Sequence, residues 1–138
     1  MRAQAIFGPV SVLALWTLLV LAMTGSRRIR GALSGRVPRT AFRLGESAEV
    51  PPDIVVVNRN LMNLLEAPVL FYVVCISLYV TRQVNTAMVT LAWVYVLLRV
   101  VHSFIHLTSN RIMQRLIVYA ASNFVLLAIW LWFLWRVY

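Results

Sequence analysis

The chain has 138 residues, of which 62% are hydrophobic and 12% are charged, whereas soluble domains average ~45–50% and ~25%. Thirteen basic residues, all of them arginine, stand against four acidic ones for a net charge of +9, and a single cysteine excludes a disulfide scaffold. This composition excludes a soluble domain and a disordered chain. The charge lies between long apolar segments rather than on a soluble basic surface, so we expect an integral membrane protein with no nucleic-acid partner.

Four segments are long and apolar enough to cross a membrane, which requires about 20 mostly apolar residues per helix. In chain order we predict helices at about residues 6–24, 54–81, 83–107 and 112–136, with a long loop at 25–53 and two short turns. The arginine-rich segment after the first span favours a retained anchor over a cleaved signal peptide, and Asp53 is predicted to cap the second helix. We therefore predict an all-α, four-transmembrane-helix bundle that forms a single domain over residues 1–138.

The arginines are distributed unequally between the two ends of this predicted bundle. Eight lie in or beside the long loop and the last turn, at positions 27, 28, 30, 36, 39, 43, 111 and 115, and three lie at the opposite end, at positions 2, 82 and 136. Because short segments rich in basic residues stay in the cytoplasm, we expect loops one and three to be cytoplasmic and both termini to lie outside. The absence of lysine is typical of a GC-rich bacterial genome, so we expect a bacterial inner membrane.

Two of the predicted spans carry ionisable side chains, which are costly in hydrocarbon unless they are paired or hydrated. The two polar faces consist of Arg59, Asn63 and Glu66 on the second helix and of Arg99, His102 and His106 on the third. Neither face can contact lipid, so we expect them to face each other, with Glu66 against Arg99 and Arg59 against His106. The result is a predicted polar cleft open to the cytoplasm and rimmed by further arginines, namely Arg28, Arg30, Arg111 and Arg115.

The simpler alternative is a buried ion pair between Glu66 and Arg99 that only fixes helix packing. That alternative leaves the remaining polar groups unexplained, so we favour a binding site. His102 and His106 have the spacing of metal ligands, but arginines surround them and no Glu or Cys cluster accompanies them, so we expect no metal. Arginines suit carboxylates, a buried glutamate suits an ammonium group, and an arginine can stabilise a thiolate, which together favour a small zwitterionic ligand with a thiol.

The segment at 58–68, Asn-Arg-Asn-Leu-Met-Asn-Leu-Leu-Glu-Ala-Pro, has a core of Arg59-x-x-x-Asn63-x-x-Glu66. This core resembles the signature of the MAPEG family, membrane-associated proteins in eicosanoid and glutathione metabolism, and the resemblance extends from about residue 24 to residue 119. It implies a four-helix membrane protein that assembles as a homotrimer and binds glutathione between adjacent subunits at the cytoplasmic side.

The resemblance also implies roles for individual residues. Glu66 would accept the γ-glutamyl amine of glutathione, and Arg59 and Asn63 would hold its polar or carboxylate groups. Arg115 would be the catalytic residue, beside the thiol. The other residues implied to bind glutathione are Arg28, Arg99, His102, His106 and Tyr119. The chain departs from the family pattern at Leu116, where the prostaglandin synthase branch has serine, and at His106, where other members have tyrosine.

Three functions are compatible with these residues. We favour a membrane-bound, glutathione-dependent transferase or peroxidase that acts on lipophilic electrophiles, as in detoxification. The same chemistry with another low-molecular-weight thiol is the second. The third is a non-enzymatic trimer whose polar cleft holds the subunits together or binds a lipid head group. The expected partners are further copies of the chain, membrane lipids and a lipophilic substrate.

Overall fold

The computed structural model describes residues 2–43 and 47–138, and every regular element in that part of the chain is a helix. The elements are η1 (Ala3–Ile6), α1 (Phe7–Leu33), η2 (Arg39–Phe42), α2 (Pro52–Leu65), α3 (Ala67–Val80), α4 (Thr86–Leu107) and α5 (Ile112–Val137). Within the described residues, four segments are long and apolar enough to cross a membrane. Helix η1 together with α1 forms the first, α2 together with α3 forms the second, and α4 and α5 each form one. The predicted all-α bundle with four spans is confirmed.

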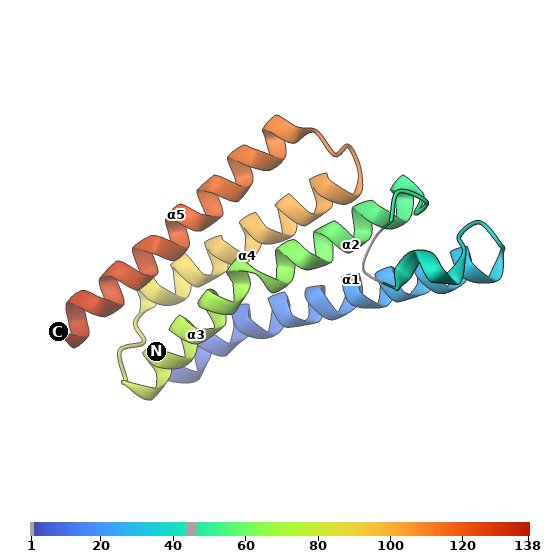
Figure 1. Cartoon of the computed structure of the whole chain (residues 1–138). Coiled ribbons are helices and arrows are strands. Elements are labelled where there is room, and N and C mark those ends of the chain that lie inside the picture. The colour runs from blue at the N-terminus through green and yellow to red at the C-terminus, as the bar shows by residue number, and fades with distance from the viewer. Residues whose placement is uncertain (1, 44–46) are drawn as a thin grey trace.

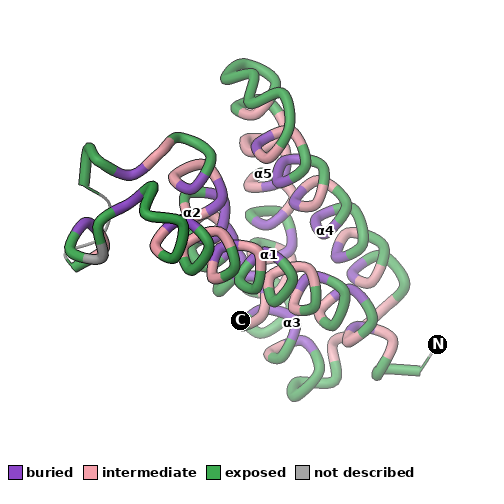
Figure 2. The backbone as a smooth tube through the Cα atoms, turned by 90° about the vertical axis from the view of Figure 1, so that its right-hand side faces the viewer, coloured by how far each residue is buried: buried purple, intermediate pink, exposed green. Residues whose placement is uncertain are grey.

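The helices lie side by side, with both chain termini at one end (Figure 1). We call this the terminal end, and we call the opposite end, which holds the connections after α1 and after α4, the loop end. Buried positions lie along the helix sides that face one another, and the outward sides are exposed (Figure 2). The main apolar core draws on all four spans, for example Leu13, Leu64, Phe71, Tyr95 and Ile129.

Helix α1 continues past its predicted end at residue 24. Its 27 residues extend about 40 Å, roughly 10 Å more than the hydrocarbon thickness of a bilayer. The arginine-rich segment after Thr24 contains no proline, so charge ends the membrane span without ending the helix. The prediction of a loop starting at residue 25 is therefore wrong, since the helix ends at Leu33.

The predicted second helix at 54–81 is divided in two at Glu66, whose φ of −85° and ψ of −94° lie outside the helical region. Pro68 has no amide hydrogen to donate to the Leu64 carbonyl, and its ring crowds that carbonyl, so a continuous helix is not possible there. The Glu66 amide still donates to the Met62 carbonyl at 3.1 Å, and the Val69 amide donates to the Glu66 carbonyl at 3.2 Å. Helices α2 and α3 thus form one span with a break in its middle.

The starts of α2 and α4 also differ from the prediction. Pro51 occupies the N-cap position of α2, so the predicted Asp53 cap is wrong. Asp53 instead lies in the first turn and pairs with Arg36 at 3.0 Å. Helix α4 begins at Thr86 rather than at 83, because the side chain of Asn85 accepts a hydrogen bond from the Met88 amide at 3.0 Å and so caps the helix.

A small polar group crosses the core and joins three helices. Trp16 Nε1 from α1 and Asn60 Nδ2 from α2 both donate to Ser103 Oγ on α4, at 2.9 and 2.7 Å. Asn60 and Ser103 are fully buried, so these bonds have no competition from water. The hydroxyl of Ser103 is thus a structural acceptor, which fixes α1, α2 and α4 relative to one another.

Candidate functional site

A cleft of about 250 Å³ opens between α2, α4 and α5 in the half of the bundle nearer the loop end. It is lined by Asn63, His102, Ile112, Arg115, Leu116 and Tyr119. Four of these belong to the predicted site, and the other two, Ile112 and Leu116, add an apolar wall. Because Ile112 is 76% exposed and Leu116 is 56% exposed, this wall opens onto the outer surface of the bundle.

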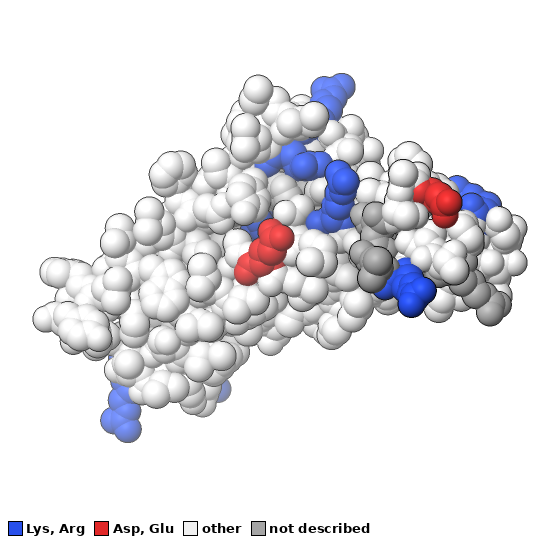
Figure 3. Space-filling model, in the orientation of Figure 1, with Lys and Arg blue, Asp and Glu red and all other residues white. Residues whose placement is uncertain are grey.

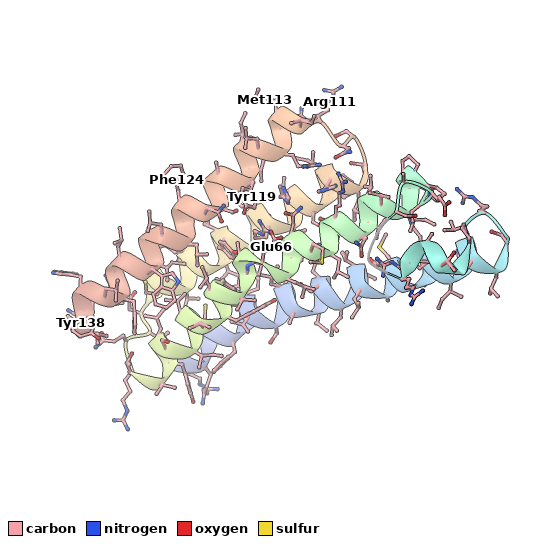
Figure 4. All side chains as sticks on the ribbon, viewed as in Figure 1. Glu66, Arg111, Met113, Tyr119, Phe124 and Tyr138 are labelled. Carbon is pink, nitrogen blue, oxygen red and sulfur yellow. The ribbon has the colours of Figure 1, made fainter. Side chains whose placement is uncertain are left out.

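Arg99 lies behind the cleft and is fully buried. Its Nη2 donates to the backbone carbonyl of Asn63, and its guanidinium lies 5.4 Å from the centre of the Tyr119 ring. The His102 ring lies 5.6 Å from the same tyrosine, which is on the side of α5 that faces α4 (Figure 4). Arg99 Nε and Nη1 have no hydrogen-bond partner among the described residues. A buried cation with unused donors is unfavourable by itself and favours an anionic or hydrogen-bond-accepting ligand nearby.

Arg115 is held in place by the short turn between α4 and α5. Its Nη1 donates to Asn110 Oδ1 at 2.6 Å. Asn110 has a φ of 48°, a left-handed conformation that asparagine tolerates well, and its amide donates to the Ile105 carbonyl at 2.7 Å. The turn therefore fixes the first turn of α5 and the position of the Arg115 guanidinium on the cleft.

No hydrogen bond or ion pair joins Glu66 to Arg99, so the predicted pairing of these two residues is wrong. The break after α2 leaves Glu66 exposed, while Arg99 bonds to the Asn63 carbonyl instead. One acidic group lies at the place where Glu66 is labelled in Figure 4, and basic groups lie beside it on the side toward the loop end (Figure 3). The one ion pair among the residues that the structure describes is that of Arg36 and Asp53, far from the cleft.

Two other predicted residues, Arg59 and Arg28, also lie outside the cleft. Arg59 is exposed on α2, and no hydrogen bond joins it to His106, which is 2% exposed with its ring 6.1 Å from that of His102. Arg28 is half-buried on α1, where its Nη2 donates to Asn58 Oδ1 at 2.8 Å and its guanidinium lies over the Phe42 ring at 5.4 Å. The predicted site residues are thus divided into two groups within one chain. Arg28, Arg59 and Glu66 lie outside the cleft, and the others line it or lie behind it.

The apolar wall was not predicted, although a signal for it exists in the sequence. Ile112, Leu116 and Tyr119 follow one another at spacings of four and three residues, which places them on one face of α5 together with Arg115. Among the described residues, no group of three His, Cys, Asp or Glu side chains is close enough to hold a metal ion. The single cysteine, Cys75, is fully buried in the apolar core.

Four membrane-length helices with a polar cleft between three of them define an α-helical integral membrane protein. The model of the MAPEG family matches residues 6–135, nearly the whole chain. The chain therefore belongs to the MAPEG family, and the resemblance found in the sequence is confirmed. Comparisons with curated proteins and with solved structures find no match.

Proposed function

We propose that this chain is a membrane-bound, glutathione-dependent transferase or peroxidase that acts on lipophilic electrophiles. Its family includes glutathione transferases and peroxidases as well as non-enzymatic members, so membership alone does not decide the activity. The observation that carries the proposal is the cleft, because it brings the cationic side chain of Arg115 and an apolar wall together in one small volume.

The proposed chemistry depends on a thiolate, since the thiolate and not the thiol is the nucleophile. The guanidinium of Arg115 would stabilise the negative sulfur of glutathione within the cleft, as a positioned positive charge does for a developing anion. In conjugation the sulfur bonds to an electrophilic carbon, and the leaving group departs with its electron pair. In peroxidase turnover the sulfur would attack the terminal oxygen of a lipid hydroperoxide, so that the O–O bond breaks and the lipid alcohol leaves after protonation. A second glutathione would then displace the oxygen of the resulting sulfenic acid as water, which gives the disulfide.

The apolar wall supports a substrate that arrives from the bilayer. Ile112 and Leu116 are exposed on the outer surface of α5, which would contact lipid in the membrane. A lipophilic electrophile could therefore reach the cleft laterally without passing through water. The polar side chains of Asn63, His102 and Tyr119 line the same cleft and would position the tripeptide.

The exposed Glu66 supports assembly into a homotrimer. An acidic side chain in the middle of a span costs about 2.5–3.5 kcal/mol on insertion scales if it faces lipid, so a covering subunit would be favourable. We propose that a neighbouring subunit covers this face and that glutathione binds between the two. Glu66 would then accept its amine, and Arg28 and Arg59 would hold its carboxylates. The cleft of a single chain, at about 250 Å³, lies below the ~300 Å³ at which ligand pockets begin, which supports completion by a neighbour.

The proposed orientation places the loop end in the cytoplasm of a bacterium and both termini on the outer side of its inner membrane. The excess of arginine at the loop end supports this orientation. Glutathione would then enter from the cytoplasm, since the cleft and Arg115 lie in the half of the bundle nearer the loop end.

One specific observation favours a second candidate, a non-enzymatic trimer. Arg59 and Glu66 are exposed on the same span, and charge pairing across a subunit interface would occupy both without any thiol. A third candidate keeps the chemistry with another carboxylate-bearing thiol, because the arginines would hold its carboxylates equally well.

A thermal-shift series on the purified protein separates the three candidates. We expect glutathione to raise the melting temperature, with the shift abolished by Glu66→Ala and reduced by Arg115→Ala. Arg136→Ala, at the terminal end, is the matched control and should leave the shift intact. A shift with γ-glutamylcysteine or cysteine alone would select another thiol. No shift with any thiol, together with loss of the trimer in Glu66→Ala, would select the non-enzymatic assembly.

A further inference from the structure

Two adjoining grooves lie on α1 near the loop end, separate from the cleft. The first has a volume of about 290 Å³ and is lined by Leu19, Ala22, Met23, Ser26, Arg27 and Arg30. The second has a volume of about 400 Å³ and is lined by Arg27, Arg30, Gly31, Ser34, Arg36 and Asp53. The two grooves share Arg27 and Arg30, so they form one continuous surface that is apolar at one end and basic at the other.

This polarity matches the depth of the residues in a bilayer. Helix α1 is about 40 Å long, so its last residues extend beyond the ~30 Å of hydrocarbon. Leu19 and Met23 lie within the hydrophobic part of the span, and Arg27 follows Met23 by one helical turn, about 6 Å along the axis. An acyl chain along the apolar end would therefore bring its phosphate to the level of the two arginines.

Both arginines have hydrogen-bond donors available for a phosphate. Arg30 is exposed, and its side chain forms no hydrogen bond or ion pair with another residue that the structure describes. Arg27 donates one bond from Nη1 to the backbone carbonyl of Asp53, at 2.6 Å, which orients its guanidinium. The carboxylate of Asp53 is paired with Arg36 at 3.0 Å, so an adjacent positive charge offsets its repulsion of an anion.

The second groove has a packed wall, so it is preorganised. A Cβ atom on Gly31 would lie 2.8 Å from Ile54 Cδ1, which shows how closely α1 approaches the start of α2 there. Val37, Ala41, Val50 and Ile54 form a buried apolar cluster that packs the loop after α1 against both helices. The backbone that carries Arg27, Arg30 and Arg36 is therefore held in place by buried apolar packing.

We propose that these grooves bind one anionic phospholipid, with an acyl chain along Leu19 and Met23 and its phosphate on Arg27 and Arg30. The proposed orientation places the grooves in the cytoplasmic leaflet, whose anionic lipids attract basic residues. The lipid site shares no residue with the thiol cleft, so a test of lipid binding does not depend on whether the chain is a glutathione-dependent enzyme.

Native mass spectrometry of the purified protein from a neutral detergent tests this site. The probes are phosphatidylglycerol, phosphatidylcholine with the same acyl chains, and inorganic phosphate. We expect one phosphatidylglycerol to be retained and its affinity to fall about fivefold in Arg30→Gln, the factor contributed by one basic residue near an anionic membrane. Arg43→Gln removes a charge from the same loop outside both grooves and should change nothing, and phosphatidylcholine should not be retained.

Ala22→Phe separates a lipid site from a simple anion site, since it fills the apolar groove without removing charge. We expect it to weaken phosphatidylglycerol binding, and we expect inorganic phosphate not to displace the lipid. Arg30→Gln breaks no contact between described residues, so we expect it to fold and elute normally on size exclusion. Equal retention of phosphatidylglycerol in Arg30→Gln and Arg43→Gln, or full displacement by inorganic phosphate, would overturn the proposal.

Discussion

Replacing Ser103 with alanine tests how the polar group in the core holds α1, α2 and α4 together. The change removes the acceptor of two hydrogen bonds, from Trp16 Nε1 at 2.9 Å and from Asn60 Nδ2 at 2.7 Å. Side-chain hydrogen bonds inside membrane proteins contribute about 0.6 kcal/mol each on average and up to about 1.7 kcal/mol. Asn60 loses its partner at a fully buried site and Trp16 at a partly buried one, so we expect a loss of about 1–3 kcal/mol in the free energy of unfolding.

The assay is equilibrium unfolding by dodecyl sulfate in mixed micelles, followed by far-UV circular dichroism. Ser26→Ala is the matched control, because the Ser26 hydroxyl is exposed and bonds only to the Ala22 carbonyl of its own helix, at 2.8 Å. We expect that control to stay within about 0.5 kcal/mol of the wild type. Equal unfolding free energies for Ser103→Ala and Ser26→Ala would refute the reasoning that the buried group stabilises the helix arrangement.

Three further substitutions test the packing of the loop after α1, the exposed ion pair and the apolar wall of the cleft. Gly31→Ala should have a free energy of unfolding about 1–3 kcal/mol lower than that of Gly25→Ala in thermal melting. The new Cβ atom at position 31 would lie 2.8 Å from a buried isoleucine, whereas a Cβ atom at Gly25 would meet open space. Equal stability of the two variants would show that the packing around Gly31 adjusts at no cost. Arg36→Gln should cost less than about 1 kcal/mol in the same melting experiment, since both partners of its ion pair are about half exposed, and a larger loss would mean that the pair is shielded from water. Leu116→Trp puts a larger side chain into the wall of the cleft. We expect kcat/KM for a lipophilic electrophile to fall about tenfold or more, equivalent to ~1.4 kcal/mol, while the Kd for glutathione stays unchanged. An unchanged kcat/KM would mean that the substrate binds elsewhere.

The spans were predictable from the sequence because their length and hydropathy are set by the bilayer. The same reasoning failed where the apolar segment and the helix end at different residues. Arginines after Thr24 end the apolar segment, but nothing there interrupts backbone hydrogen bonding, so α1 continues to Leu33. Helix boundaries therefore have to be taken from prolines and caps, such as Pro51 and Asn85, rather than from the first charged residue.

The residues of the cleft were predictable in part. Asn63 lines the cleft together with His102, as the helical spacing predicted, whereas Arg59, one turn earlier on the same helix, does not. Glu66 was predicted to face Arg99 on the assumption of a continuous helix, and Pro68, which is visible in the sequence, invalidates that assumption. Contacts between helices distant in the chain, such as that of His102 with Tyr119, depend on packing that no local pattern encodes.

The central claim is that Arg115 stabilises a glutathione thiolate in the cleft between α2, α4 and α5. The most direct measurement is a titration of the purified protein with glutathione that follows the ultraviolet absorbance of the thiolate. We expect a saturable rise in thiolate absorbance for the wild type, and a much smaller rise for Arg115→Ala at saturating glutathione. No thiolate signal in the wild type, or the same signal in Arg115→Ala, would contradict the claim.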